Sequence, residues 1–178
     1  YYQLLQWLPK FENNILKKIK KNLRLSLNQN LIDCSLSIED EIDLSNYIGI
    51  YGANGWTAYT GVVDTGKVKA GDNFVVSAAA GCTGLLAGQI AKIAGCRVIG
   101  IAGSDEKCRL IREEFGFDAA INYKTEDISS CLRSLCPEGV NVYFDNVAGA
   151  TLDAVLENMA IFGTVAVCGL MENYGSVD

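Results

Sequence analysis

The sequence predicts a doubly wound α/β fold with a parallel sheet, and three observations carry this prediction. Short apolar runs alternate with helical segments from Asn73 to Cys168. The runs are apolar on both faces, which indicates strands covered by helices on each side of the sheet. A glycine-rich turn containing Gly81 and Gly84 joins the first run to its helix. Such a strand, turn and helix open a Rossmann-type domain.

The elements follow one another in a regular order. A helix at Trp56–Val63, closed by Gly66, precedes the sheet. The predicted elements after it are a strand at Asn73–Ala78, a helix at Cys82–Ala94, a strand at Arg97–Ala102, a helix at Asp105–Phe115, a strand at Ala119–Asn122, a helix at Ile128–Leu135, a strand at Val140–Phe144, a helix from about Thr151 to Met159 and a strand at Thr164–Cys168.

The first 43 residues differ in composition from the rest. A basic stretch comes first and an acidic one follows, before glycine-rich apolar sequence begins. We therefore predict an atypical leader over residues 1–43 and a dinucleotide-binding domain over residues 44–178. Residues 11–27 have the pattern of a basic amphipathic helix for a membrane surface or partner, and the alternative is a solvated leader.

Composition excludes several classes of function. The net charge of −6 and the lack of a basic stripe argue against nucleic acid, and no apolar run is long enough to span a membrane. The seven scattered cysteines are typical of reduced thiols, so we expect a cytoplasmic protein. Without histidine or a Cys-x-x-Cys pair, no metal site is expected.

The turn after the first strand is the principal candidate for ligand binding. Gly81 lets the backbone approach a pyrophosphate, Gly84 lets the helix pack on the strand, and the free N–H groups of Cys82 and Thr83 face the anion. Ala79 stands where the full fingerprint has its first glycine. The alternative is an ordinary tight turn.

The tip of the second strand indicates which dinucleotide is bound. NAD-binding domains place an acidic residue there, but this strand ends Ala102-Gly103-Ser104 and Lys107 follows. A 2′-phosphate would meet a cation, so the sequence favours NADPH. The alternative for Lys107 is a solvated lysine paired with Glu106.

Two further strand ends lie at the same predicted edge of the sheet. Asn146 follows the fourth strand and is a candidate to bind the cofactor, and Cys168-Gly169 ends the fifth. Turn residues are the alternative at each. Catalytic residues are not assigned, because there is no histidine and no Tyr-x-x-x-Lys pair. A bound cofactor would supply the hydride chemistry.

Five segments together resemble the zinc-free medium-chain dehydrogenases/reductases. They are Val75–Lys92 (VVSAAAGCTGLLAGQIAK), Gly100–Lys107, Gly116–Lys124 (GFDAAINYK), Val142–Asn146 (VYFDN) and Cys168–Tyr174. The resemblance is to the group of prostaglandin reductases, leukotriene B4 12-hydroxydehydrogenases and NADPH-dependent 2-alkenal reductases.

The resemblance implies roles for individual residues. Gly81 to Gly84 would hold the pyrophosphate, Lys107 and Tyr123 would bind the 2′-phosphate, and Asn146 with Cys168 to Tyr174 would line the cofactor cleft. The implied reaction is NADPH-dependent reduction of the C=C bond of an α,β-unsaturated aldehyde or ketone, with a small-molecule enal or enone as the partner.

The chain also departs from the family pattern. The GroES-like substrate domain that precedes this region in the family is absent, so we expect a truncated cofactor-binding part. Tyr51-Gly-Ala-Asn-Gly-Trp replaces a Gly-Met-Pro-Gly-Leu run, and Ala148 replaces the first of two glycines. A non-catalytic NADPH-binding module and a domain for another adenine-containing ligand remain alternatives. An uncovered apolar sheet edge predicts a homo-oligomer.

Overall fold

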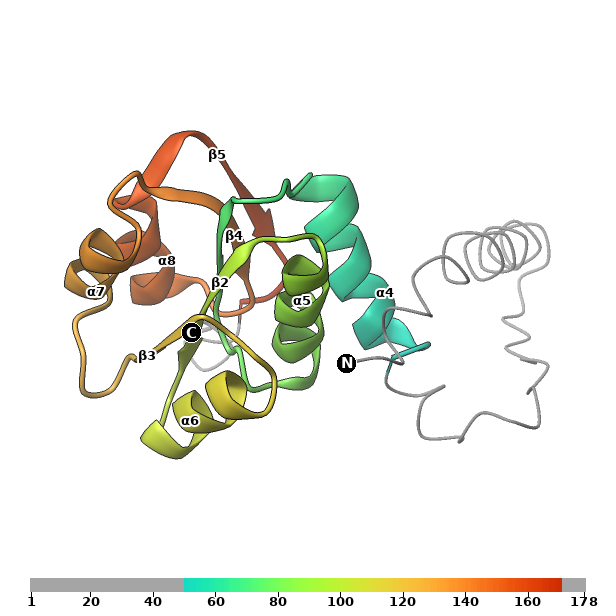
Figure 1. Cartoon of the computed structure of the whole chain (residues 1–178), viewed down its shortest axis with the longest axis horizontal. Coiled ribbons are helices and arrows are strands. Elements are labelled where there is room, and N and C mark those ends of the chain that lie inside the picture. Colours follow the sequence, from blue (N-terminus) through green and yellow to red (C-terminus); the bar gives the residue numbers. More distant parts are fainter. Residues whose placement is uncertain (1–49, 171–178) are drawn as a thin grey trace, which may run out of the picture. The chain divides into compact units, whose positions relative to one another are not determined.

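The computed structural model describes residues 50–170, and its sheet confirms the predicted fold class (Figure 1). Five parallel strands lie in the order β3-β2-β1-β4-β5. The predicted leader (residues 1–43) and Tyr174 lie outside the described residues. The strands are β1 Asn73–Val76, β2 Arg97–Ala102, β3 Ala119–Asn122, β4 Val140–Asp145 and β5 Met159–Val167. The helices are α4 Ala53–Tyr59, the π-helical η2 Thr60–Thr65, α5 Cys82–Ile93, α6 Asp105–Glu113, α7 Ile128–Leu135 and α8 Gly149–Leu156.

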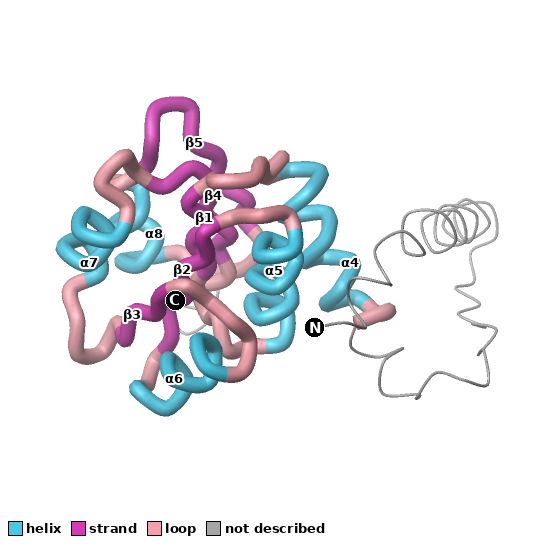
Figure 2. The backbone as a smooth tube through the Cα atoms, viewed as in Figure 1, coloured by secondary structure: helices cyan, strands magenta, loops and turns pink. Residues whose placement is uncertain are grey.

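Helices cover both faces of the sheet, as Figure 2 shows. Successive side chains of a strand point to opposite faces. Phe74 and Val76 of β1 therefore belong to one buried cluster, with residues of η2, α5 and α6, and Val75 belongs to another, with residues of α7 and α8. The chain winds from β1 to β3 on one side and through β4 to β5 on the other, which is the doubly wound arrangement.

The helical segment before the sheet is longer than predicted. The sequence indicated Trp56–Val63, whereas the helix begins at Ala53 and continues as a π-helix to Thr65. The N–H of Gly66 donates to the carbonyl of Gly61 at 2.9 Å, five residues back. A Cβ on Gly61 would lie 2.3 Å from the Phe144 ring, so only glycine allows this approach.

The last helix and strand are also shifted from their predicted bounds. The helix expected from about Thr151 to Met159 is α8, which starts at Gly149 and ends at Leu156. The chain then enters β5 at Met159, earlier than the predicted Thr164. Met159 pairs with Val140 and Thr164 with Val142, so residues 160–163 bulge out of the sheet. Because the bulge breaks the alternation of side chains along β5, the sequence pattern did not indicate the first half of this strand.

One core contact uses two glycines to make room for a phenylalanine. A Cβ on Gly88 of α5 would lie 2.0 Å from Cζ of Phe117, and a Cβ on Gly100 of β2 would lie 3.0 Å from the same ring. The same Cβ on Gly100 would lie 2.8 Å from the Ala79 methyl. The core therefore accommodates alanine at position 79, where the fingerprint has glycine, because Gly100 has no side chain. None of the helices within residues 50–170 is long and apolar enough to cross a membrane.

Candidate functional site

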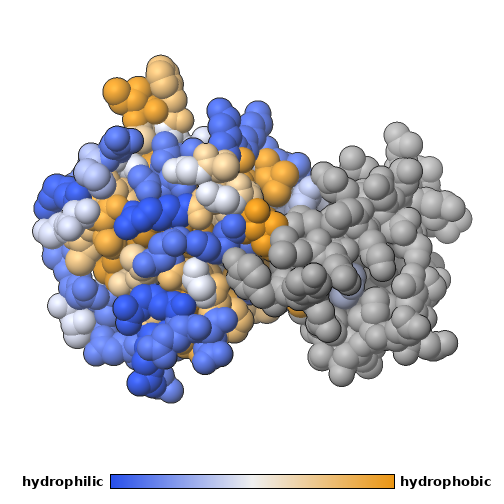
Figure 3. Space-filling view, in the orientation of Figure 1, coloured by the Kyte–Doolittle hydropathy of each residue, from blue (hydrophilic) through white to orange (hydrophobic). Residues whose placement is uncertain are grey.

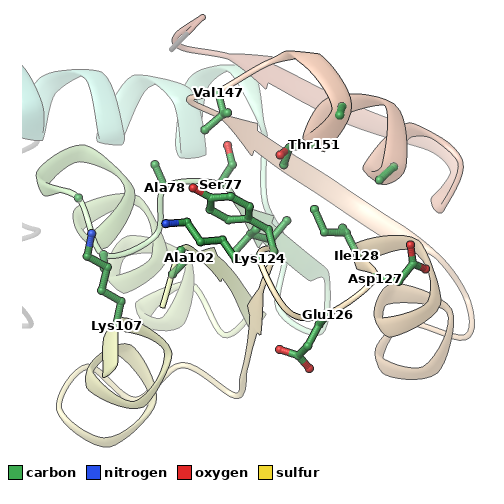
Figure 4. A pocket seen from close by; sticks show the side chains of 17 residues that line it. Ser77, Ala78, Ala102, Lys107, Lys124, Glu126, Asp127, Ile128, Val147 and Thr151 are labelled. Atoms are coloured by element: carbon green, nitrogen blue, oxygen red, sulfur yellow. The ribbon is translucent and has the colours of Figure 1, made fainter. Parts of the chain in front are cut away.

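A cavity of about 720 Å³ opens at the carboxyl edge of the sheet (Figure 4). Its walls come from the segments that follow β1, β2, β3 and β4. Strand order reverses at β1, and such reversal points are where open α/β sheets bind ligands. The lining residues are Ser77, Ala78, Ala80, Gly81, Ile101, Ala102, Gly103, Lys107, Tyr123, Lys124, Glu126, Asp127, Ile128, Val147, Ala150, Thr151 and Ala154.

The turn between β1 and α5 forms one wall. Its first half is strained, because Ala78 adopts a φ of 48°. The N–H of Gly81 donates to the carbonyl of Ala78 at 2.9 Å, and a Cβ on Gly84 would lie only 2.5 Å from that oxygen. Gly84 is thus required for the close contact of helix and strand, and Gly81 lines the cavity.

The first turn of α5 leaves backbone donors available for an anion. Within the described part of the chain, no side chain caps this helix. The first N–H groups of a helix have no partner inside it, and the helix dipole adds partial positive charge there. Thr83 is partly engaged, since its hydroxyl donates to Oδ1 of Asn54 at 2.8 Å. Cys82 is exposed at the helix start.

Two lysines from different segments also line the cavity. Lys107 comes from the first turn of α6, and Lys124 follows β3 by two residues. Within residues 50–170, neither ammonium group has an ion-pair partner. The ion pair found there within 4.0 Å joins two other residues, Lys92 and Asp118. The alternative pairing of Lys107 with Glu106 is not seen. Sequence reasoning missed Lys124, although its place just after the third strand marked it for this edge.

The tip of β2 lies under an aromatic ring. A Cβ on Gly103 would lie 3.0 Å from both Cε1 and the hydroxyl of Tyr123, so the ring lies against this glycine. Tyr123 is 50% exposed and lines the cavity. The hydroxyl of Ser104 accepts from the N–H of Lys107 at 3.3 Å and caps α6. The β2 tip therefore presents small residues and a capped helix, with no acidic residue on the strand end.

The end of β4 is tied to the end of β1 by buried hydrogen bonds. The Asn146 side-chain amide donates to the Ser77 carbonyl at 2.7 Å, and its backbone N–H donates to the Ser77 hydroxyl at 2.8 Å. Asp145 Oδ1 accepts from the Ser77 hydroxyl, the Tyr143 hydroxyl and the N–H groups of Val147 and Ala148, at 2.8 to 3.1 Å. Asn146 is only 7% exposed and lies beside the cavity lining.

The segment after β5 continues this cluster. The N–H groups of Cys168 and Gly169 both donate to the carbonyl of Asp145, at 2.7 and 3.1 Å. Burial, followed by the nearby charge of Asp145, raises the pKa of the Cys168 thiol. A Cβ on Gly169 would lie 2.7 Å from the Asn146 carbonyl. Cys168 and Gly169 thus lie against the β4 end without lining the cavity.

Comparison with known proteins gives consistent results. The family described as zinc-binding dehydrogenase matches residues 82–178. A tobacco 2-alkenal reductase (NADP(+)-dependent) is 48% identical over 137 residues, which cover 76% of this chain and 40% of the relative. Mouse prostaglandin reductase 1 is 46% identical over 136 residues, covering 76% of this chain and 41% of that protein.

A solved structure shows the same likeness in three dimensions. CurA from Vibrio vulnificus, in complex with NADPH, superposes with a TM-score of 0.74 at 39% identity and covers 79% of this chain and 42% of its own. The chain spans about two fifths of the length of these relatives. The chain therefore belongs to the zinc-binding dehydrogenase family, as the cofactor-binding part shared with NADP-dependent alkenal and prostaglandin reductases.

Proposed function

We propose that this chain is the cofactor-binding part of an NADPH-dependent reductase of the C=C bond in α,β-unsaturated aldehydes and ketones. One observation carries the cofactor assignment. Lys107 and Lys124 place two ammonium groups, unpaired within residues 50–170, beside a β2 tip that has no acidic residue. A 2′-phosphate would be attracted to this place, whereas an acidic tip would repel it. The substrate class follows from the relatives, one of which is a 2-alkenal reductase.

Residues of the cavity and of the strand ends beside it are proposed for successive parts of the cofactor. The pyrophosphate would lie on the N–H groups of Gly81, Cys82, Thr83 and Gly84. The 2′-phosphate would bind Lys107, Lys124 and Tyr123. Asn146, Cys168 and Gly169 are proposed for the nicotinamide side, because Asn146 is bonded to Ser77 and the other two to Asp145 at the adjoining strand ends. Tyr174 is proposed for the same side from the family resemblance alone. When bound, NADPH supplies the hydride for the β-carbon of the enal or enone.

The same proposal includes three further properties of the protein, which are zinc independence, a cytoplasmic location and a homo-oligomeric state. Zinc independence is supported by a sequence without histidine. A cytoplasmic location is supported by the free thiols of the six cysteines in residues 50–170. A homo-oligomer is supported by the β5 bulge, where Ile161 and Phe162 are 88% and 99% exposed. Figure 3 shows apolar atoms standing out from the surface there.

Calorimetric titration of the full chain with NADPH and with NADH tests the cofactor assignment. We expect tighter binding of NADPH. Lys107→Ala and Lys124→Ala should each weaken NADPH about tenfold, or about 1.4 kcal/mol, and leave NADH unchanged, because each removes one charged contact to the 2′-phosphate. Lys69→Ala is the control, since Lys69 is exposed and lies outside the cavity lining. Equal affinities for the two cofactors would contradict the assignment and favour another adenine-containing ligand.

An assay of enal reduction distinguishes an active reductase from an NADPH-binding module without catalysis. Oxidation of NADPH, followed by absorbance, should depend on an added short 2-alkenal if the chain retains catalysis. Binding of NADPH without alkenal-dependent oxidation would favour a non-catalytic NADPH-binding module, because an isolated half of a cleft orients substrate poorly.

A further inference from the structure

Acidic residues lie close in sequence to the two lysines of the cavity. Asp105 lies two residues before Lys107 in the first turn of α6, and Glu126 lies two residues after Lys124. A carboxylate that paired with either ammonium group would cancel its charge and repel a phosphate. Both lysines are nevertheless unpaired within the described residues. The partners of these two carboxylates therefore bear on the charge that a phosphate would meet at this site.

Asn122, the last residue of β3, makes hydrogen bonds that account for this. Its side-chain Nδ2 donates to Oδ1 of Asp105 at 2.6 Å, and its backbone N–H donates to Oε2 of Glu126 at 2.7 Å. Its side-chain Oδ1 accepts from the N–H of Lys124 at 3.2 Å. One residue thus engages both carboxylates and the backbone of one lysine.

The position of Asn122 suits a fixed anchor. The residue is 4% exposed, and its backbone pairs with Ala102 in the β2–β3 ladder. It joins the first turn of α6, which carries Lys107, to the loop that carries Lys124. In Figure 4 the side chains of Lys107 and Lys124 extend toward the loop after β1, whereas the carboxylate of Glu126 points the other way.

We propose that Asn122 is a positioning residue that sets the preference for a 2′-phosphate over a 2′-hydroxyl. It does so by holding Asp105 off the lysine pair and by fixing the backbone of Lys124. Asn122 is outside the cavity lining and acts through these neighbours. This inference rests on the proposed function, because it concerns the cofactor preference of the same site.

Asn122→Ala tests the proposal through the ratio of NADPH to NADH affinity, measured by calorimetry on the full chain. Release of the Asp105 carboxylate toward the lysines should lower this ratio about fivefold and leave NADH affinity unchanged. The magnitude follows from one like-charge interaction over about 4 Å in fully solvated surroundings, about 1 kcal/mol. A loss that is equal for both cofactors would show a merely structural role and would overturn the proposal.

Rescue by a second substitution identifies the cause. Asp105→Asn in the Asn122→Ala background removes the released charge and should restore most of the ratio, whereas Asp105→Asn alone should change it less than twofold. Failure of this rescue would overturn the proposed action through Asp105. Asn158→Ala is the matched control, because Asn158 is similarly buried and its side chain donates to Ser129 and Ala154, away from the lysines. It should leave the ratio unchanged.

Two further measurements distinguish failure of the proposed role of Asn122 from failure of the proposed preference for NADPH. If Asn122→Ala does not fold, Asn122→Asp keeps the volume and the acceptor for Lys124, and it should lower the ratio at least as much because it adds a charge. If the unmodified chain does not prefer NADPH, the proposed function itself fails. If the chain prefers NADPH and both Asn122 variants keep that preference, only the role of Asn122 is overturned.

Discussion

Replacing Gly88 by alanine tests how tightly α5 is seated on the sheet. The added methyl would lie 2.0 Å from Cζ and 2.7 Å from both Cε atoms of Phe117, a buried side chain. Overpacking of this kind costs up to about 3 kcal/mol. Alanine in place of glycine inside a helix contributes about 1 kcal/mol in the opposite direction. The clash is therefore expected to win, with a net loss of about 2 kcal/mol.

This loss should appear as a decrease in Tm of about 4–8 °C for a chain of this length, measured by calorimetry or circular dichroism. Phe117→Leu in the same background should relieve the clash, so the two substitutions together should cost less than the sum of their separate effects. Ser134→Ala, at an exposed position of α7, introduces a helical alanine without a clash and should raise Tm slightly. A Gly88→Ala protein as stable as the unmodified chain would refute this account of the packing.

One further substitution and one thiol reagent probe buried groups near the strand ends. Asp145→Ala removes the acceptor for the Ser77 and Tyr143 hydroxyls and two backbone N–H groups, so urea denaturation should show a loss of about 3 kcal/mol or more. A loss below 1 kcal/mol would contradict this. Burial raises the pKa of Cys96 to about 11, so at pH 8 about one thiol in a thousand is ionised. Its alkylation by iodoacetamide should be much slower than that of exposed Cys82 in the folded chain, should speed up as pH rises toward 11, and should match Cys82 in urea. Equal rates in the folded chain, read by peptide mass spectrometry, would argue against this environment.

Most of the sheet could be predicted because its strands and helices have clean boundaries in the sequence. Arg97–Ala102, Ala119–Asn122 and Ile128–Leu135 were predicted with the bounds that the structure shows. Each is an apolar or amphipathic run between turn residues, so local pattern and tertiary packing agree. The predicted end of the first helical segment and the predicted start of the last strand were wrong. Both depend on contacts between residues far apart in the chain, namely the packing of Gly61 on Phe144 and the bulge at residues 160–163.

The candidate site was predictable where one motif carried it. The glycine turn and Lys107 follow from the strand, turn and helix pattern, and both line the cavity. Lys124 and Asn122 were missed, because a place at the end of the third strand assigns them to this edge of the sheet but does not show which groups they contact. Their importance comes from hydrogen bonds to Asp105 and Glu126, which only the fold brings within reach.

The strand order also has a consequence for how the chain reaches its folded state. β1 lies between β2, its neighbour in sequence, and β4, whose junction with it joins Ser77 and Asn146, 69 residues apart. A ribosome adds about 5–20 residues per second, so one edge of β1 waits roughly 3–14 seconds for its partner. The first strand-helix-strand unit can close early, but its open edge displays unpaired backbone groups meanwhile. The nascent chain is thus most exposed to wrong strand pairing before β4 has been synthesised.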